Sequence, residues 1–306
     1  MILVLGSNGF VGKTMCERLK RESVKFYPAT HSECDLRNRQ ETRELFKRVQ
    51  PDYVINLAAF LGGVHFGYEH AAEMFTNNML MQINILDACH DFKVKRLINP
   101  IGSCIYPGEL DIYTEEKLWD GPMHKSVLAF ATAKKSFVVA SWAYHKQYGM
   151  DIMNLVMSNM YGPFDHFDET RSHAVGALIR KMAEAKKNDI PTVCILGSGA
   201  PIREWLYVED AVDALYRAIS AAPYSSIINI GVAKGYSIQE TAELIKELIG
   251  YQGQLVNNTE YMDGAMCKRV DGSLGNTLLD WHAKTEFREG LKNTIEWYIK
   301  YGESIL

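Results

Sequence analysis

Short runs of β-branched and aliphatic residues alternate with longer segments in which apolar residues recur at helical spacing. The apolar runs cover residues 2–5, 24–27, 53–56, 96–99 and 151–157, and the helical segments cover residues 9–21, 40–49, 68–91 and 127–148. Pro51 and Gly149 stand where two of these helices should end. This alternation of strands and helices predicts a parallel sheet with helices on both faces.

The regular alternation loosens after Gly162, and a polar loop, a helix, a short strand and a second glycine-rich turn follow. We expect an α/β protein: a Rossmann-type doubly wound parallel sheet with a smaller C-terminal α/β substrate domain. The predicted boundaries are 1–160 for the dinucleotide-binding domain and 161–306 for the second, nucleotide-sugar-binding domain. A strand near residues 226–230 is expected to return to the first sheet.

Charge and the uncharged stretches limit the class of protein. The 306 residues include 33 basic and 37 acidic side chains, a net charge of -4, which lacks the basic footprint that nucleic acid or an anionic membrane requires. The longest uncharged stretches, such as 54–64, are too short to cross a bilayer. The N-terminus goes from a short apolar run into Gly6 without the features of a secretory signal, so we expect a cytoplasmic protein.

Six cysteines are scattered without the short spacings of a zinc site or a disulfide framework, and we expect no metal.

A glycine-rich turn near the N-terminus predicts a cofactor site. It follows the first predicted strand, opens the first helix, and would place a dinucleotide pyrophosphate on that helix N-terminus. The alternative is a glycine turn without a ligand. The predicted cofactor contacts here are Gly6, Asn8, Gly9, Phe10, Val11 and Gly12.

The loop after the second strand does not decide between NAD and NADP. Residues 27–31 contain neither an acidic residue for a ribose 2'-hydroxyl nor an arginine for a 2'-phosphate. Asp35 and Leu36 form the Asp-Leu pair that many such folds place beside adenine, although an exposed aspartate after a turn is an alternative.

A series of segments then occurs in an order that resembles the extended short-chain dehydrogenases/reductases, nearest to their GDP-L-fucose synthase branch. The segments are 56–60, 77–79, 102–107, 133–134, 159–163, 172–173, 197–199 and 203–210. The resemblance covers essentially the whole chain. It implies 3,5-epimerisation and 4-reduction of a nucleotide-linked 4-keto sugar, most simply a GDP-4-keto-6-deoxy sugar. It also implies NADP(H) as the favoured cofactor, with NAD(H) possible, and a homodimer.

The resemblance also implies further cofactor contacts in the first domain, namely Leu57, Ala58, Ala59, Lys134, Met157 and Met160. It matches Cys104 and His173 to the acid/base pair for epimerisation. Removing a proton beside a carbonyl and returning one to the opposite face requires two such groups, and a thiol and an imidazole titrate close enough to neutral pH. Cys104 taken alone would more often be a buried structural cysteine.

The redox centre implied by the resemblance is a Ser or Thr, a Tyr and a Lys. Lys134 is present, but Phe130 occupies the tyrosine position four residues earlier, and Gly102 occupies the serine position. Ser103 could substitute only if the loop re-aims it, because neighbouring residues of an extended segment point to opposite faces.

Three explanations of these replacements remain open. The first is an introduced Tyr-to-Phe change, the second is an enzyme whose reduction is weakened or lost, and the third is a silent binder of nucleotide sugars. A fourth reading makes Phe130 an ordinary core aromatic in a shifted helix register.

Several polar residues of the second half match positions that the family directs at the nucleotide sugar. Arg and Lys are natural partners of a diphosphate, although each taken alone could be a surface charge. Asn159 could instead form a turn. Together with His173, the predicted substrate contacts are Asn159, Arg180, Lys181, Arg203 and Lys268.

Overall fold

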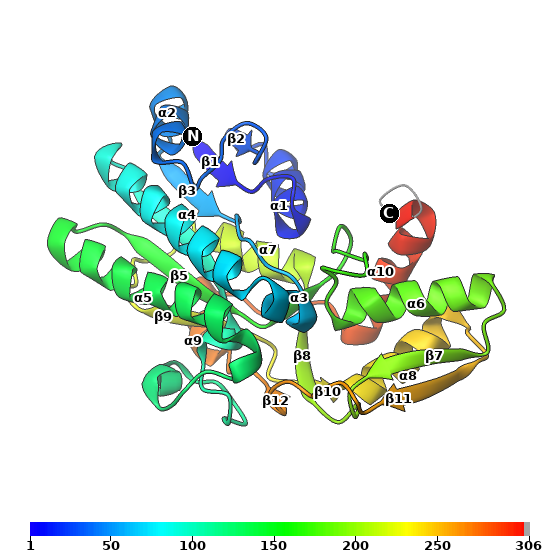
Figure 1. Ribbon diagram of the computed structural model, residues 1–306. Helices are drawn as coiled ribbons and strands as arrows, with labels where there is room; N and C mark the ends of the chain where they lie inside the picture. The colour runs from blue at the N-terminus through cyan, green and yellow to red at the C-terminus, as the bar shows by residue number, and fades with distance from the viewer. Residues whose placement is uncertain (303–306) are drawn as a thin grey trace.

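The computed structural model describes residues 1–302, and its centre is a six-stranded sheet (Figure 1). The strand order is β2-β1-β3-β4-β5-β9, and every neighbouring pair is parallel. The strands are β1 (Ile2–Leu5), β2 (Phe26–Ala29), β3 (Tyr53–Asn56), β4 (Arg96–Gly102), β5 (Ile152–Met157) and β9 (Ile227–Ile230). The predicted Rossmann-type doubly wound fold is therefore confirmed.

Helices cover both faces of this sheet because successive residues of its buried strands point to opposite sides. Ile2 and Val4 pack under α1 (Phe10–Arg21) and α7 (Val208–Arg217). Leu3 and Leu5 pack under the helices of the other face. Those are α2 (Arg39–Val49), α4 (Ala71–Asp91) and α5 (Leu128–Tyr148).

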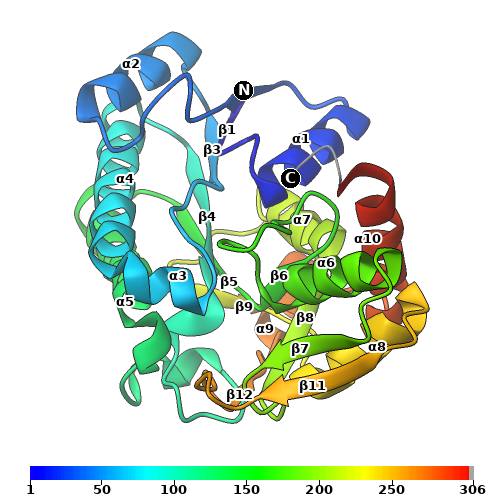
Figure 2. The same cartoon turned by 45° about the vertical axis from the view of Figure 1, so that its right-hand side comes forward.

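A second group of elements forms its own apolar core beside the sheet (Figure 2). Its strands are β6 (Asn159–Tyr161), β7 (Thr192–Leu196), β8 (Ile202–Tyr207), β10 (Gly235–Ser237), β11 (Gln254–Asn258) and β12 (Cys267–Lys268), and its helices are α6 (Ala174–Lys187), α8 (Ile238–Ile249) and α10 (Phe287–Tyr301). In this group β8 pairs with β6, β10 and β12, and β7 pairs with β11. The short helix α9 (Ser273–Leu279) lies against β9.

The direction of chain progression reverses between β1 and β3, because the strand that follows β1 in sequence lies on one side of it and β3 lies on the other. In open α/β sheets, ligands bind at such a switch point, in the crevice outside the carboxyl ends of the strands. This topology fixes where the site should be.

The prediction of one helix over residues 68–91 was wrong at its start. The chain forms α3 (Val64–Glu69) and then α4, with a break at His70. The His70 ring packs on Phe66 with centroids 4.4 Å apart, and its Nδ1 lies 2.6 Å from a Glu73 carboxylate oxygen. The backbone of His70 has φ -115° and ψ 30°, which is outside helical geometry, and these two contacts accompany the break.

The second strand is also shifted from its predicted bounds, because it runs through Pro28. Proline lacks the N–H that a central strand needs, but β2 is an edge strand of the sheet and tolerates it.

No helix among residues 1–302 is long and apolar enough to cross a membrane. The division into domains at residue 160 stays a prediction.

Candidate functional site

The glycine turn after β1 can exist only with glycine at two positions. Gly6 has φ +73°, and a Cβ there would lie 2.8 Å from the Ala58 amide nitrogen. A Cβ on Gly12 would lie 2.1 Å from the Gly6 carbonyl oxygen. The absence of these side chains brings the loop after β1 against the loop after β3, at the switch point.

The first turn of α1 is free of side-chain caps. Gly9 is the N-cap and offers no side-chain hydrogen bond, and no acidic residue lies in this turn. Asn8 and Gly9 are exposed. The unpaired amides of a helix N-terminus attract an anion, so this turn fits the pyrophosphate of a dinucleotide.

The loop after β3 is held from beneath by Asn78 of α4. Its Nδ2 donates to the Phe60 carbonyl oxygen at 2.8 Å, and its Oδ1 accepts from the Phe60 amide at 3.2 Å. Asn78 is fully buried. The hydrogen bonds therefore fix the backbone of the predicted cofactor contacts Leu57, Ala58 and Ala59.

Asp35 is engaged by a neighbour that the sequence analysis did not single out. Arg37 donates to both carboxylate oxygens of Asp35 through Nε and Nη2, at 2.7–3.0 Å, and these bonds hold the pKa of Asp35 below its ordinary value. Leu36 is buried. Arg37 was missed because it lies beyond the loop where a phosphate anchor was sought, and its position two residues after Asp35 was the available signal.

At the end of β4, the three positions of the implied redox centre lie close to Cys104. A Cβ on Gly102 would lie 3.5 Å from Cys104 Sγ and 4.0 Å from Phe130 Cε1. Lys134 Nζ lies 5.6 Å from the centre of the Phe130 ring. The aromatic side chain that replaces tyrosine therefore faces the same space as the thiol.

The Ser103 side chain is less accessible than that of its neighbour Cys104. Ser103 begins a short 3-10 turn (Ser103–Ile105) and is buried, whereas Cys104 is partly open. The turn carries the two neighbours to different sides, so the structure does not re-aim Ser103 in the way that a replacement for Gly102 would require.

Strand pairing places two cations side by side opposite Cys104. Arg203 of β8 and Lys268 of β12 are direct partners in the parallel register. Lys268 interacts electrostatically with both Cys104 and His173. His173 stands at the N-cap of α6. The charge of Lys268 therefore acts on both the thiol and the imidazole of the predicted pair.

Burial disfavours the charged forms of the ionisable side chains around Cys104. Burial lowers the pKa values of Lys134 and Lys268 to about 8 and raises that of the Cys104 thiol, which the two lysines oppose. Burial, with Lys268 and His166 adding, lowers the pKa of His173 to about 4. The imidazole keeps exposed surface in the cleft, which argues against full desolvation, but the direction leaves His173 neutral at pH 7 and able to accept a proton.

The remaining predicted substrate contacts have protein partners. Arg180 pairs with Glu184 at 3.0 Å and Glu169 at 3.3 Å. Lys181 Nζ donates to the Cys194 carbonyl oxygen at 3.2 Å, and Asn159 Nδ2 donates to the Glu204 carbonyl oxygen at 3.1 Å. Their roles in binding stay predictions, as do those of Met157, which is buried at the end of β5, and the partly buried Met160.

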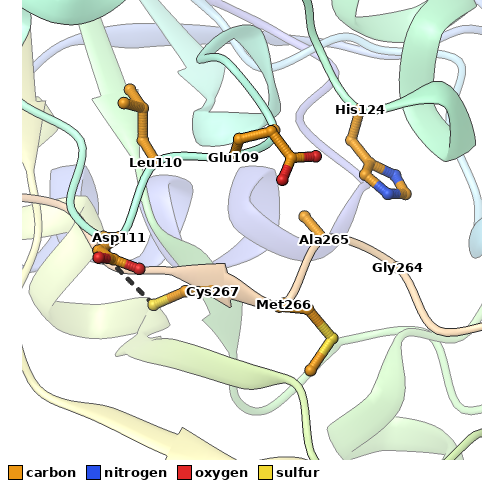
Figure 3. Close-up of a pocket in the computed structure, with 9 residues that line it drawn as sticks. Glu109, Leu110, Asp111, His124, Gly264, Ala265, Met266 and Cys267 are labelled. Atoms are coloured by element: carbon orange, nitrogen blue, oxygen red, sulfur yellow. Dashed lines mark hydrogen bonds between the residues drawn. The ribbon is translucent and has the colours of Figure 1, made fainter.

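A half-open cavity of about 240 Å³ lies between the segment after the Cys104 turn and the segment before Lys268 (Figure 3). Its lining residues are Gly108, Glu109, Leu110, Asp111, His124, Gly264, Ala265, Met266 and Cys267. Among residues 1–302, no group of three His, Cys, Asp or Glu side chains is placed to hold a metal ion.

The fold, the glycine turn at the switch point and the acid/base groups at the strand ends define a dinucleotide-binding epimerase or reductase. Residues 2–231 match the NAD dependent epimerase/dehydratase family. The chain belongs to this family, which confirms the resemblance and the enzyme class predicted from the sequence.

Proteins of known name are similar to this chain over almost its whole length. GDP-L-fucose synthase 1 of Arabidopsis thaliana is 33% identical over 301 residues, which cover 98% of this chain and 93% of that protein. The crystal structure of a GDP-L-fucose synthetase from Naegleria fowleri bound to NADP has a TM-score of 0.90 at 29% identity, covering 99% and 95% of the two chains. A GDP-6-OMe-4-keto-L-xylo-heptose reductase from C. jejuni has a TM-score of 0.92 at 26% identity, covering 98% and 97%.

Proposed function

We propose that this protein epimerises a GDP-linked 4-keto sugar at the carbons beside the carbonyl and reduces the 4-keto group slowly. The observation that supports it is the group at the end of β4, where a Cβ on Gly102 would lie 3.5 Å from Cys104 Sγ and 4.0 Å from Phe130, and where Lys268 acts electrostatically on both Cys104 and His173. One of the pair removes a proton from carbon 3 or 5, and the other returns a proton to the opposite face. A lysine ammonium beside them can stabilise the enolate oxygen.

The cofactor proposed for this site is NADP(H). The turn from Gly6 to Gly12 and the open N-terminus of α1 fit a dinucleotide pyrophosphate, and Arg37 beside Asp35 is a cation that could meet a 2'-phosphate. A bound nicotinamide supplies hydride for reduction. Lys134, buried and without a tyrosine beside it, would contact the nicotinamide ribose.

Phe130 is the reason for expecting slow reduction. Reduction produces an alkoxide at carbon 4 that needs a proton donor, and phenylalanine has no proton to give. Gly102 offers no hydroxyl and Ser103 is buried. A water molecule or a lysine would have to donate the proton, whereas the epimerisation pair is intact.

The sugar and the base are less constrained than the chemistry. The names of the relatives include enzymes of a 6-deoxyhexose, L-fucose, and of a heptose.

A second candidate function is a binding protein without turnover, which Phe130 and Gly102 favour. It would bind cofactor and nucleotide sugar but exchange no proton.

The test of the proposed function is solvent exchange. In deuterated water with GDP-4-keto-6-deoxymannose and NADPH, deuterium is expected to enter carbons 3 and 5 while NADPH absorbance falls slowly. Nuclear magnetic resonance locates the deuterium. A protein that binds the nucleotide sugar and NADPH without any exchange would be the binding protein instead.

The pH dependence of nucleotide binding tests Lys268. The pKa of Lys268 is lowered to about 8, so its positive charge is present below pH 8 and is lost as the pH rises through 8. The affinity for GDP, measured by calorimetry, is therefore expected to fall by up to about fivefold between pH 8 and pH 9. The Lys268→Met variant should bind GDP weakly at pH 7, and its affinity should change little between pH 8 and pH 9. An affinity that does not change over this range would exclude a diphosphate contact for Lys268.

A homodimer is proposed on the outer surface of α4 and α5. These helices lie side by side in Figures 1 and 2 and contact each other. Large apolar side chains remain exposed on them, namely Phe75, Leu80, Ile83, Val139 and Trp142. Apolar patches of this kind mark protein interfaces.

Replacing Trp142, which is 60% exposed, by glutamate is expected to turn the dimer into a monomer. The charge would be buried unpaired in the interface. Sedimentation equilibrium at micromolar concentration measures the mass, and Tyr261→Glu, on an exposed loop, is the matched control that should stay dimeric. A wild-type mass equal to one chain would contradict the proposal.

A further inference from the structure

The cavity of Figure 3 is built from segments that lead directly to the candidate catalytic groups. Gly108 is four residues beyond Cys104, and Cys267 immediately precedes Lys268. His124 lies six residues before Phe130 and interacts electrostatically with Lys268 and Arg203. The cavity therefore adjoins the segment that carries Cys104 and the strand that carries Lys268, on the side of Arg203 and Lys268.

The two walls of the cavity are tied together, which gives it a fixed width. Cys267 Sγ donates to the Asp111 carbonyl oxygen at 3.1 Å, and Tyr113 donates its hydroxyl hydrogen to the Cys267 carbonyl oxygen at 3.2 Å. Tyr113 is buried. Gly108 packs so closely that a Cβ there would lie 2.9 Å from His124 Cβ.

The polar groups at its mouth suit hydroxyl groups. The backbone amide of Ser126 donates to His124 Nδ1 at 3.3 Å, which leaves the proton of a neutral ring on Nε2. Figure 3 shows the Glu109 carboxylate and the His124 ring facing the same space above Ala265. A ring N–H donor and a carboxylate acceptor can bind both functions of a hydroxyl. An anionic ligand group would be repelled by the Glu109 carboxylate, so the cavity favours a neutral polar group.

We propose that this cavity binds the hydroxylated arm on carbon 5 of the sugar, so that the natural substrate class is an NDP-hexose or heptose that keeps hydroxyls beyond the ring. The inference rests on the proposed function. Carbon 5 is joined to carbon 1 through the ring oxygen, so its substituent lies on the diphosphate side of the ring, where Arg203, Lys268 and the cavity meet. The volume of about 240 Å³ is several times the 30 Å³ or so of one water and far exceeds a methyl group.

The experiment uses three sugars that differ only in this arm: GDP-6-deoxymannose, GDP-mannose and GDP-mannoheptose. None carries a 4-keto group, so calorimetry measures binding without turnover, with GDP alone as reference. The affinity is expected to rise along the series, by about tenfold from the 6-deoxy sugar to the heptose, because the longer arm gains a hydrogen bond to the charged Glu109 carboxylate.

Variants of Glu109 assign the effect to the cavity. Glu109→Leu is expected to abolish the advantage of the heptose while leaving the affinity for GDP unchanged, and Glu109→Gln should retain part of it. Glu109 is exposed, so both variants should fold. Glu289→Gln, the same change on α10, should leave the series intact.

Equal binding of all three sugars, above GDP, would overturn the arm site and leave the proposed function standing. An advantage of the heptose that survives in Glu109→Leu would also overturn it. If no sugar binds better than GDP and the keto substrate shows no exchange, the proposed function itself fails.

Discussion

Replacing Phe130 by tyrosine is expected to raise the rate of 4-keto reduction at least tenfold, with a much smaller effect on proton exchange at carbons 3 and 5. The new hydroxyl would stand beside Lys134, whose ammonium lies 5.6 Å from the ring centre and would lower the pKa of a tyrosine there. General acid catalysis contributes about 10²- to 10⁴-fold, and tenfold is the low end because other donors already act. The loss of NADPH absorbance measures reduction, and deuterium incorporation measures exchange.

A second substitution strengthens the same test. A side chain at Gly102 would be in ordinary contact with Cys104 and Phe130, at 3.5 and 4.0 Å, so Gly102→Ser should fold. The double variant with Phe130→Tyr is expected to reduce faster than either single variant. Phe92→Tyr, which adds a hydroxyl at the far end of α4, is the matched control. Rapid reduction by the natural chain, unaltered by Phe130→Tyr, would show that another residue donates the proton.

Replacing Cys104 by alanine is expected to lower solvent exchange by about 10²- to 10⁴-fold, the range lost with an acid/base group. His173→Ala is expected to have a comparable effect, with the balance between carbons 3 and 5 depending on the face that each group serves. NADPH binding, followed by fluorescence, should be unchanged in both variants because the proposed pyrophosphate site is the glycine turn that lies against Ala58.

The control for the thiol is Cys194→Ala, since Cys194 is exposed on β7 and outside the cleft. It should exchange like the natural chain. Undiminished exchange in Cys104→Ala would remove Cys104 from the mechanism. Lost exchange together with lost NADPH binding would instead indicate a damaged fold, and thermal unfolding of the variant would show this directly.

Much of the first half of the fold could be predicted because its signals are local. The apolar runs and helical patterns of residues 2–56 and 127–157 depend on neighbours in sequence, and so does the turn from Gly6 to Gly12. Lys134 follows Phe130 by one helical turn, so their contact required only the correct helix register. The break at His70 was missed because it depends on contacts of a side chain with Phe66 and Glu73.

The sequence by itself therefore determined the doubly wound sheet, the glycine turn after the first strand and the phenylalanine at position 130 one helical turn before Lys134, since each is a property of a short segment. Only the tertiary structure decided which distant groups share a site. It set Lys268 beside Arg203 across 65 residues of sequence, paired Arg180 with Glu169 and Glu184, and closed a cavity between Glu109 and Ala265. The physical reason is that strand pairing and side-chain packing select partners by complementarity in space, which no periodicity along one segment records.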